Sequence, residues 1–488
     1  MNKEAFFQKS RQGTSLLFVV FFQLITSCTN VTTPFELAPI CPDTSWLSPN
    51  LENTEVTSCN QPVYPNKEIP LGLCQLVDIG LENSVLTRQT WASARIAAAQ
   101  YAEELSNYYP DVNLQGTLSR AKTPTFGGFS SGDAVETTLL TTYGPQLTLS
   151  YLLLDFGQTK AASEALRQTL LNANWTHNRQ IQTVIQNIAS DYFNYVFTQE
   201  QLQASEANLK DANTNLQAAE QKHIMGISDI SDELSAKTQR AQILLTVLND
   251  RQEMQDALAQ LLNDLGVPSD IPVKLESLPE DPPIENACKN IQQYLAEAYS
   301  LRPDLMAARS DLMSKKANLS AAKRATNPTL SFSGTGGRTF YAKGYHDDYD
   351  YDSVLTLSIP LFKGFYYRNQ VKQAKATLEL SRATLAQLEL SVSYDVVTSY
   401  RNLLIAKEQI HAGKDYLVAA QKFYAAALSK YRAGTTDFTT LMAAQASLAN
   451  ARSAYVNAKS NWYIALKELA YSTGSLSPQS CKIQPCLE

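Results

Sequence analysis

The chain has 488 residues, and its 41 Lys plus Arg against 47 Asp plus Glu give a formal charge of −6 at pH 7. A nucleic-acid-binding protein would carry a basic excess, so nucleic acid is not expected as a partner. Charged residues make up 18% of the chain and the mean hydropathy is −0.23, which excludes both a disordered polyampholyte and a protein with many membrane-spanning helices.

The first 27 residues have the features of a secretory signal peptide. Three basic residues precede an apolar run at 16–25 that is too short to cross a bilayer as a helix. Thr26 and Ser27 then precede Cys28, a pattern that resembles the processing site of bacterial lipoproteins. We expect residues 1–27 to be removed and Cys28 to carry a covalent lipid, with an ordinary cleavage site beside a chance cysteine as the alternative.

The remaining cysteines agree with export. Their even number in an oxidising compartment indicates disulfides, although the sequence cannot choose the pairing. No C-x₂-C spacing is present and the four histidines stand far apart, so neither a metal site nor another cofactor is predicted. The six cysteines are Cys41, Cys59, Cys74, Cys288, Cys481 and Cys486.

An internal duplication organises the rest of the chain. The segment 147–150 recurs at 355–358, an offset of 208 (355 − 147), and four residues further on repeat at the same offset. These four are Lys222, Gly226, Asp229 and Ala236, which match Lys430, Gly434, Asp437 and Ala444. The predicted organisation is an N-terminal periplasmic segment (28–80), a first repeat (81–265), a Pro-rich linker (266–285), a second repeat (286–474) and a C-terminal segment (475–488).

Two segments in each repeat alternate apolar and polar residues, which predicts strands with one apolar face. They lie near 112–119, 146–154, 329–337 and 352–361. A length of about ten residues suits a tilted strand that crosses a bilayer, although soluble sandwiches show the same alternation. The stretches 120–143 and 338–351 are predicted to be polar loops that face outward.

Long helices follow each pair of strands. Residues 158–223 contain no Pro or Gly, and 366–431 are interrupted only by Gly413. About 65 residues at 1.5 Å per residue give roughly 100 Å of helix, so these helices must pack along each other. A coiled-coil rod is the alternative, but a rod does not alternate with pairs of strands.

Aromatic residues gather where strands meet helices, which suits a membrane–water boundary as well as simple packing at a joint. They are Tyr108, Tyr109, Phe156, Phe362, Phe365, Tyr366 and Tyr367. Four strands cannot close a barrel, and an open sheet edge is not tolerated in lipid. Several copies of the chain are therefore expected to share one barrel.

In this arrangement the sequence resembles the TolC-type outer-membrane factors, specifically their lipoprotein branch. The resemblance rests on the duplicated unit and on four motifs, 107–110, 225–229, 302–305 and 431–437, in their order and spacing. It implies an α+β membrane protein, a homotrimer whose twelve-stranded β-barrel, four strands per chain, continues into a long periplasmic α-helical barrel. It also implies location in the outer membrane of a Gram-negative bacterium, in contact with its lipid.

The resemblance implies a passive duct for small toxic solutes or drugs, served by a periplasmic adaptor and an inner-membrane transporter of the RND or ABC type. The exit duct of a type I protein secretion system is the alternative, and a structural coiled-coil lipoprotein is a third interpretation. No phosphate-binding loop, H-E-x-x-H motif or nucleophile elbow is present, so no enzymatic activity is expected.

The two turns between the long helices and their partners are the candidate functional sites. Each combines a Gly that can end one helix in the left-handed conformation with an Asp that can cap the next. The resemblance assigns adaptor docking to these turns, and Tyr431 and Asp437 are the candidates for closing the inner mouth. The docking residues are Gly226, Ile227, Ser228, Asp229, Gly434, Thr435, Thr436 and Asp437.

Overall fold

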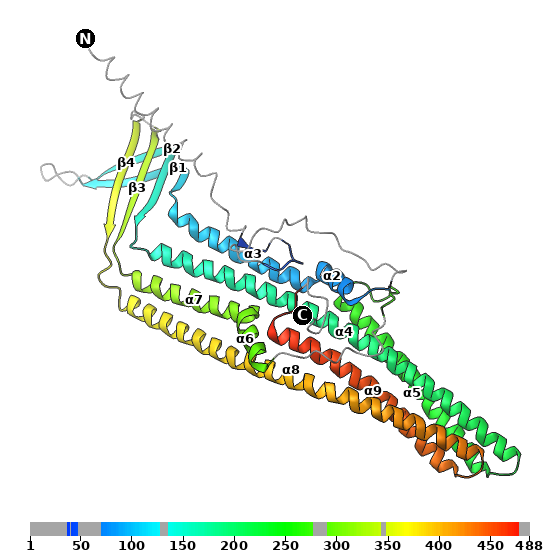
Figure 1. Cartoon of the computed structure of the whole chain (residues 1–488). Coiled ribbons are helices and arrows are strands. Elements are labelled where there is room, and N and C mark those ends of the chain that lie inside the picture. Colours follow the sequence, from blue (N-terminus) through cyan, green and yellow to red (C-terminus); the bar gives the residue numbers. More distant parts are fainter. Residues whose placement is uncertain are drawn as a thin grey trace.

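The computed structural model of the chain describes residues 37–39, 41–46, 70–126, 135–276, 290–342 and 348–477. The predicted signal peptide, Cys28 and part of the Pro-rich linker lie outside the described residues. The molecule is long and narrow, with a sheet at one end and paired helices that extend away from it (Figure 1).

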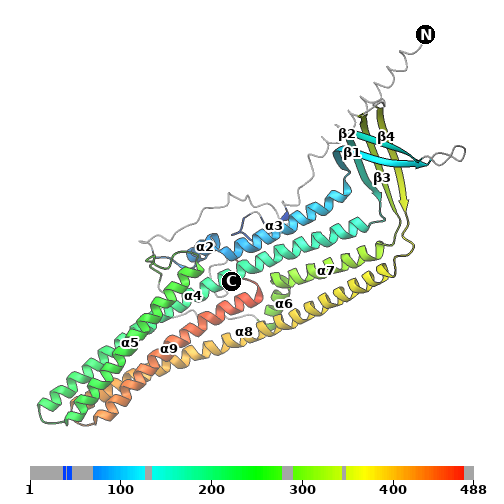
Figure 2. The same cartoon turned by 180° about the vertical axis from the view of Figure 1, so that it is seen from behind.

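Each repeat follows the predicted order of helix, two strands, long helix and returning helix. The first repeat comprises α2 (Leu73–Asn83), α3 (Val85–Leu105), β1 (Asp111–Phe126), β2 (Val135–Leu154), α4 (Gln158–Ile224) and α5 (Ile230–Asp264). The second comprises α6 (Ile291–Leu301), α7 (Pro303–Arg324), β3 (Thr329–Tyr341), β4 (Asp348–Ser358), α8 (Tyr366–Arg432) and α9 (Phe438–Thr473). The hairpins α4–α5 and α8–α9 end together, farthest from the sheet (Figures 1 and 2).

The backbone confirms the duplication. Helices α4 and α8 each have 67 residues, and both their first and their last residues are 208 positions apart. Every described residue with a positive φ has a counterpart at the same offset. The four pairs are Phe156 with Gly364, Gly157 with Phe365, Gly226 with Gly434, and Gly266 with Gly474.

A Phe residue with left-handed backbone conformation lies at each junction between a strand and a long helix. Phe156 has a φ of 52° and precedes Gly157, whereas Phe365 has a φ of 63° and follows Gly364. A non-glycine residue in this region costs on the order of 1–2 kcal/mol. Both rings are exposed, at 52% and 62%, so the chain accepts the backbone strain while presenting an aromatic side chain at the end of the sheet.

The four strands form one antiparallel sheet in the order β1-β2-β3-β4. Its register confirms the predicted faces, because paired residues on neighbouring strands share a face. On one face Val112 pairs with Leu149, and Phe332 pairs with Leu355. On the other face Thr148 pairs with both Asn113 and Thr335, which gives the sheet one apolar and one polar surface.

The predicted loops at 120–143 and 338–351 are wrong for most of the described residues, which form strands, and positions 127–134 and 343–347 lie outside the described residues. Strands β1 and β2 have 16 and 20 residues and remain paired as far as Phe126 and Val135. Strands β3 and β4 have 13 and 11 residues, and β4 stops at Ser358, short of the predicted end at 361. The polar composition of these segments favours a loop, but Thr and Tyr also favour strands, and the hydrogen-bonded pairing of the strands extends through them.

Of the six cysteines for which disulfides are expected, Cys59, Cys288, Cys481 and Cys486 lie outside the described residues. Cys41 is disulfide-bonded, whereas the thiol of Cys74 is free. Cys74 lies in the first turn of α2, a helix that packs against α4.

Two different cores join the helices. Near the middle of the molecule α4, α5, α8 and α9 bury large side chains such as Ile188, Phe193, Leu261 and Trp462. Towards the tips the buried side chains are mostly small, including Ala219, Ala420, Ala444 and Ala451. Small side chains allow close approach of the helix axes, and the two hairpins lie together at their tips (Figures 1 and 2).

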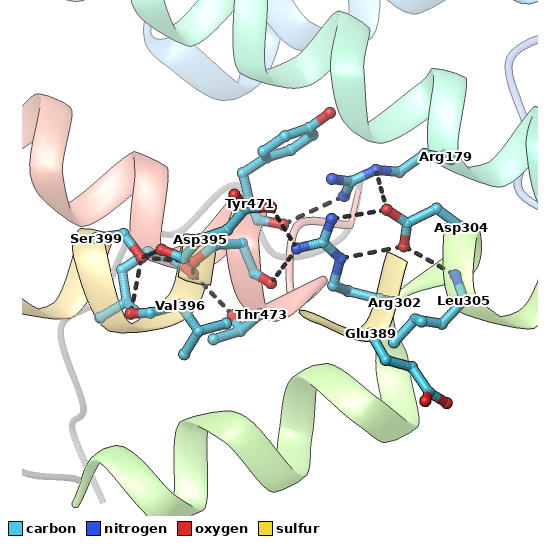
Figure 3. A network of polar contacts seen from close by, with 12 residues as sticks. Arg179, Arg302, Asp304, Leu305, Glu389, Asp395, Val396, Ser399, Tyr471 and Thr473 are labelled. Carbon is cyan, nitrogen blue, oxygen red and sulfur yellow. Dashed lines mark hydrogen bonds and ion pairs between the residues drawn. The ribbon is translucent and has the colours of Figure 1, made fainter. Parts of the chain in front are cut away.

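Two arginines fasten the end of α9 to the other helices (Figure 3). The side chain of Arg302 is 4% exposed and binds Asp304 at 2.7 Å, Asp395 at 3.2 Å and the carbonyl of Ser472 at 3.2 Å. Arg179 of α4 donates to the carbonyl of Tyr471 at 3.2 Å. Cations at the carboxyl end of a helix are favourable, so this cluster fixes the base of α9.

Replacement of Arg302 by Met should lower the free energy of unfolding by about 1.5–3 kcal/mol, because it removes charge-assisted hydrogen bonds to the partly exposed carboxylates of Asp304 and Asp395, of which Asp304 keeps Arg179 at 3.6 Å. The exposed pair of Arg382 with Glu379 supplies the control, since Arg382→Met should cost less than about 1 kcal/mol. Thermal unfolding of the purified protein measures both. Equal melting temperatures for the two variants would contradict the assigned role.

The same cluster makes the free energy of unfolding depend on pH. Burial alone would raise the pKa of Asp304, but its hydrogen bond from Arg302 and the charges of both arginines hold this pKa below its ordinary value. A depressed carboxyl pKa contributes stability above the unfolded-state value, near 4, and this contribution disappears as the pH falls through the folded-state pKa. The destabilisation by Arg302→Met should therefore be full at neutral pH and shrink in strong acid.

Candidate functional site at the helix tips

Both long helices end in the same backbone turn. Gly226 and Gly434 have φ values of 69° and 76°. The N–H of Ile227 donates to the carbonyl of Lys222 at 2.9 Å, and the N–H of Thr435 donates to that of Lys430 at 3.0 Å. This is the Schellman arrangement that satisfies the last carbonyls of a helix with a left-handed glycine. The predicted role of both glycines in ending a helix is confirmed.

The predicted capping by aspartate is also present. The carboxylate of Asp229 accepts from the N–H of Ile230 at 2.7 Å, and that of Asp437 accepts from the N–H of Thr440 at 3.0 Å. The hydroxyl of Thr440 also donates to Asp437, and these hydrogen bonds hold the pKa of this carboxyl below its ordinary value. Asp437 is therefore ionised at neutral pH and caps α9.

The two tips present different surfaces. A Cβ added at Gly226 or Gly434 would meet no atom within 4 Å, so both turns face open space. The first tip exposes four large apolar side chains, whereas the positions 208 residues further on in the second tip are Arg432, Ala433, Thr435 and Phe438, of which Phe438 is buried. The exposed apolar residues of the first tip are Ile224, Met225, Ile227 and Ile230.

Tyr431 lies between the two hairpins rather than at the surface of the tip. It is 1% exposed, and its hydroxyl donates to Asp232 of α5 at 3.5 Å. The ammonium of Lys222 lies 3.9 Å from the centre of the Tyr431 ring, and the ring of Phe438 packs at 5.5 Å. Burial, together with the nearby Asp232 charge, raises the pKa of Tyr431 to about 12. The phenol stays protonated and remains a donor to Asp232.

Further polar contacts join α4 to the second hairpin above Tyr431. Tyr424 donates to Asn215 at 3.0 Å, and Asn215 donates to Gln445 at 2.7 Å. Higher on the same helices, Arg452 binds Asp211 at 2.8 Å and Lys459 binds Glu200 at 2.7 Å. Each of these polar pairs needs its specific partner. Together with the Tyr431–Asp232 contact, they therefore fix one register between the two hairpins.

The structure separates the two residues that the sequence suggested for closing the mouth. Tyr431 joins the hairpins, whereas Asp437 caps its own helix, and the carboxylate that meets Tyr431 is Asp232. Sequence reasoning missed Asp232 because the contact crosses 199 positions between the two repeats. The sequence shows Lys222 only as the counterpart of Lys430 in the duplication. It does not indicate that the Lys222 ammonium lies over the Tyr431 ring.

The described part of the chain has no helix that is long and apolar enough to cross a membrane. Nor do its His, Cys, Asp and Glu residues gather in groups of three or more that could bind a metal ion. Cys28, the expected lipidation site, lies outside the described residues.

Comparison with known proteins identifies a family and solved structures that share this architecture. Residues 76–267 and 294–475 match the family model described as outer membrane efflux protein. Protein CyaE of Bordetella pertussis is 25% identical over 354 residues, 71% of this chain and 72% of the relative. The probable outer membrane lipoprotein SilC of Salmonella typhimurium is 24% identical over 417 residues, 82% of this chain and 86% of the relative. The solved structure of the outer-membrane channel OprN has a TM-score of 0.73 at 19% identity and covers 88% of this chain and 98% of that one.

Proposed function

The chain belongs to the outer membrane efflux protein family, and we propose that it conducts small toxic solutes passively from a periplasmic adaptor and an inner-membrane pump to the outside. It is an outer-membrane channel component of an export system, as are its relatives. The single observation that carries the proposal is a four-stranded sheet with one apolar and one polar face.

The edges of the sheet support a shared barrel. Among the described residues β1 pairs only with β2, and β4 pairs only with β3, so each edge strand carries unpaired backbone groups. Such edges are not tolerated in lipid, and joining β4 of one copy to β1 of the next satisfies them. Three copies then close a barrel of twelve strands, with the apolar face towards lipid and the polar face around water.

The inner end of the duct is proposed to close at the tips. Tyr431, Asp232 and Lys222 hold the second hairpin against the first within one chain. Loss of this contact would free α9 at its tip, while Arg302 and Arg179 still fix its base. Opening is therefore proposed as an outward movement of the α8–α9 hairpin that leaves the rest of the chain in place.

Docking of the adaptor is proposed at the turns 226–229 and 434–437. The exposed apolar side chains of the first tip supply contact area, and the fixed Schellman backbone presents them in one geometry. The transporter behind the adaptor is proposed to be of the RND type, with an ABC type and protein secretion as the alternative. No enzymatic role is proposed.

A deletion strain separates the two forms of transport. Loss of the gene should increase susceptibility to small toxic solutes, and the wild-type gene should restore resistance. Unchanged susceptibility, together with loss of a protein from the culture medium, would overturn efflux in favour of secretion.

Acylation of Cys28 is proposed as an additional anchor, because small residues precede this cysteine after an apolar run. Radiolabelled fatty acid should enter the wild-type protein and not Cys28→Ser. Since the barrel already fixes the channel in the membrane, the variant should keep most of its resistance phenotype. Equal labelling of both proteins would refute the assignment.

A further inference from the structure

Two cations lie on the apolar face of the sheet. Leu118 pairs with Tyr143, and Tyr143 pairs with Phe340, so these three residues share that face. Arg120 and Lys122 follow Leu118 along β1 at steps of two, which places them on the same face. Both are exposed, and both lie in the second half of β1, the half that is farther along the chain from α3.

A third cation is held among aromatic rings on this face. Arg338 precedes Phe340 by two positions and pairs with Tyr349 on β4. Its guanidinium carbon lies 4.9 Å from the centre of the Phe340 ring and 5.2 Å from that of Tyr349. The rings of Tyr143 and Phe340 stack at 5.4 Å. The Nε of Arg338 is a buried donor without a hydrogen-bond partner among the described residues.

The acidic residues near this end lie on the opposite face. Asp352 pairs with Thr335 and Asp350 pairs with Gly337, which places both carboxylates on the polar surface. Within the described chain no ion pair neutralises Arg120, Lys122 or Arg338. The sheet therefore separates charge by face, with cations and aromatic rings outside and carboxylates inside.

Cations beside aromatic rings at one end of a lipid-facing surface match the depth of lipid headgroups. Guanidinium groups bind phosphate through two parallel hydrogen bonds, and basic clusters at membrane surfaces recognise anionic lipids. We propose that Arg120, Lys122 and Arg338 bind the headgroup phosphates of lipids in the outer leaflet. This inference rests on the proposed orientation, in which the strand turns face outward.

Lipid binding to assembled trimers in a non-ionic detergent tests the proposal. The probe is phosphatidic acid, with diacylglycerol of the same acyl chains as the uncharged control, and native mass spectrometry counts the bound lipids. The combined variant Arg120→Gln, Lys122→Gln and Arg338→Gln should lower the affinity for phosphatidic acid at least about tenfold. Lys363→Gln, at the opposite end of the strands, should leave it within about twofold.

Equal affinity of the wild type and the combined variant would overturn the proposal. Displacement of phosphatidic acid by an equal concentration of inorganic phosphate would also overturn it, because the site would then select a free anion. If the combined variant does not assemble, Arg120→Gln alone, at an exposed position, should still lower the affinity about threefold. Ion conductance of the same trimers is recorded separately, so failure of the channel function and failure of lipid binding are distinguishable.

Discussion

Gly226→Arg and Gly434→Arg should each abolish export and leave the trimers folded. Both glycines adopt left-handed backbone, and the space around them is open, so an arginine would strain the turn without clashing inside the chain. The long cationic side chain would project from the tip into the surface proposed for the adaptor. Resistance to toxic solutes measures export, and electrophoresis of unheated membranes measures trimers.

Asparagine supplies the matched control, because it tolerates left-handed backbone better than other non-glycine residues. Gly226→Asn and Gly434→Asn should keep most of the resistance. If the arginine variants export as well as the wild type, these turns are not the docking surface. If the arginine variants do not form trimers while the asparagine variants do, backbone strain rather than a blocked docking surface accounts for the loss of export.

Leu149→Arg and Leu357→Arg should prevent assembly of the channel in membranes. Both side chains lie on the apolar face, where the register pairs Leu149 with Val112 and Leu357 with Leu330. An arginine on the lipid face costs about 2–4 kcal/mol near the bilayer midplane, and the cost is repeated in each of the three copies. The amount of trimer in the outer membrane measures the effect.

Thr148→Arg and Thr356→Arg are the matched controls on the neighbouring positions. Their side chains lie on the polar face, which is proposed to line the water-filled lumen, so trimers should form and single-channel conductance should change. Equal loss of trimer for both pairs of variants would contradict the assignment of the faces.

Local patterns predicted much of the fold. The absence of Pro and Gly gave the long helices to within one or two residues, because a helix is continuous where nothing interrupts its hydrogen bonds. The repeated Gly and Asp residues gave the turns, since left-handed backbone and N-capping each favour few residue types. The apolar alternation gave the faces of the sheet, and the register of all four strands agrees with it.

Contacts between distant segments could not be predicted in the same way. Strands β1 and β2 extend into the segment that was expected to be a loop, because the two strands pair with each other there. The sequence of a polar segment taken alone does not indicate such pairing. The partner of Tyr431 is on the other hairpin, so Asp232 became visible only when the two repeats lay side by side. Arg302 belongs to the motif at 302–305, whereas its contacts with Asp395 and Ser472 form only in the folded chain.

Single-channel conductance in planar bilayers tests most directly the claim that this protein is a passive duct closed by contacts between its hairpins. Wild-type trimers should conduct ions weakly, because the tips are proposed to be closed. Replacement of Tyr431 by Phe together with Asp232→Ala removes the inter-hairpin hydrogen bond and keeps the aromatic packing with Phe438, so conductance should rise several-fold. Asp437→Ala alone should raise it less, since this carboxylate caps its own helix. Absence of any ion current, or equal conductance of the wild type and the Tyr431→Phe, Asp232→Ala variant, would contradict the account.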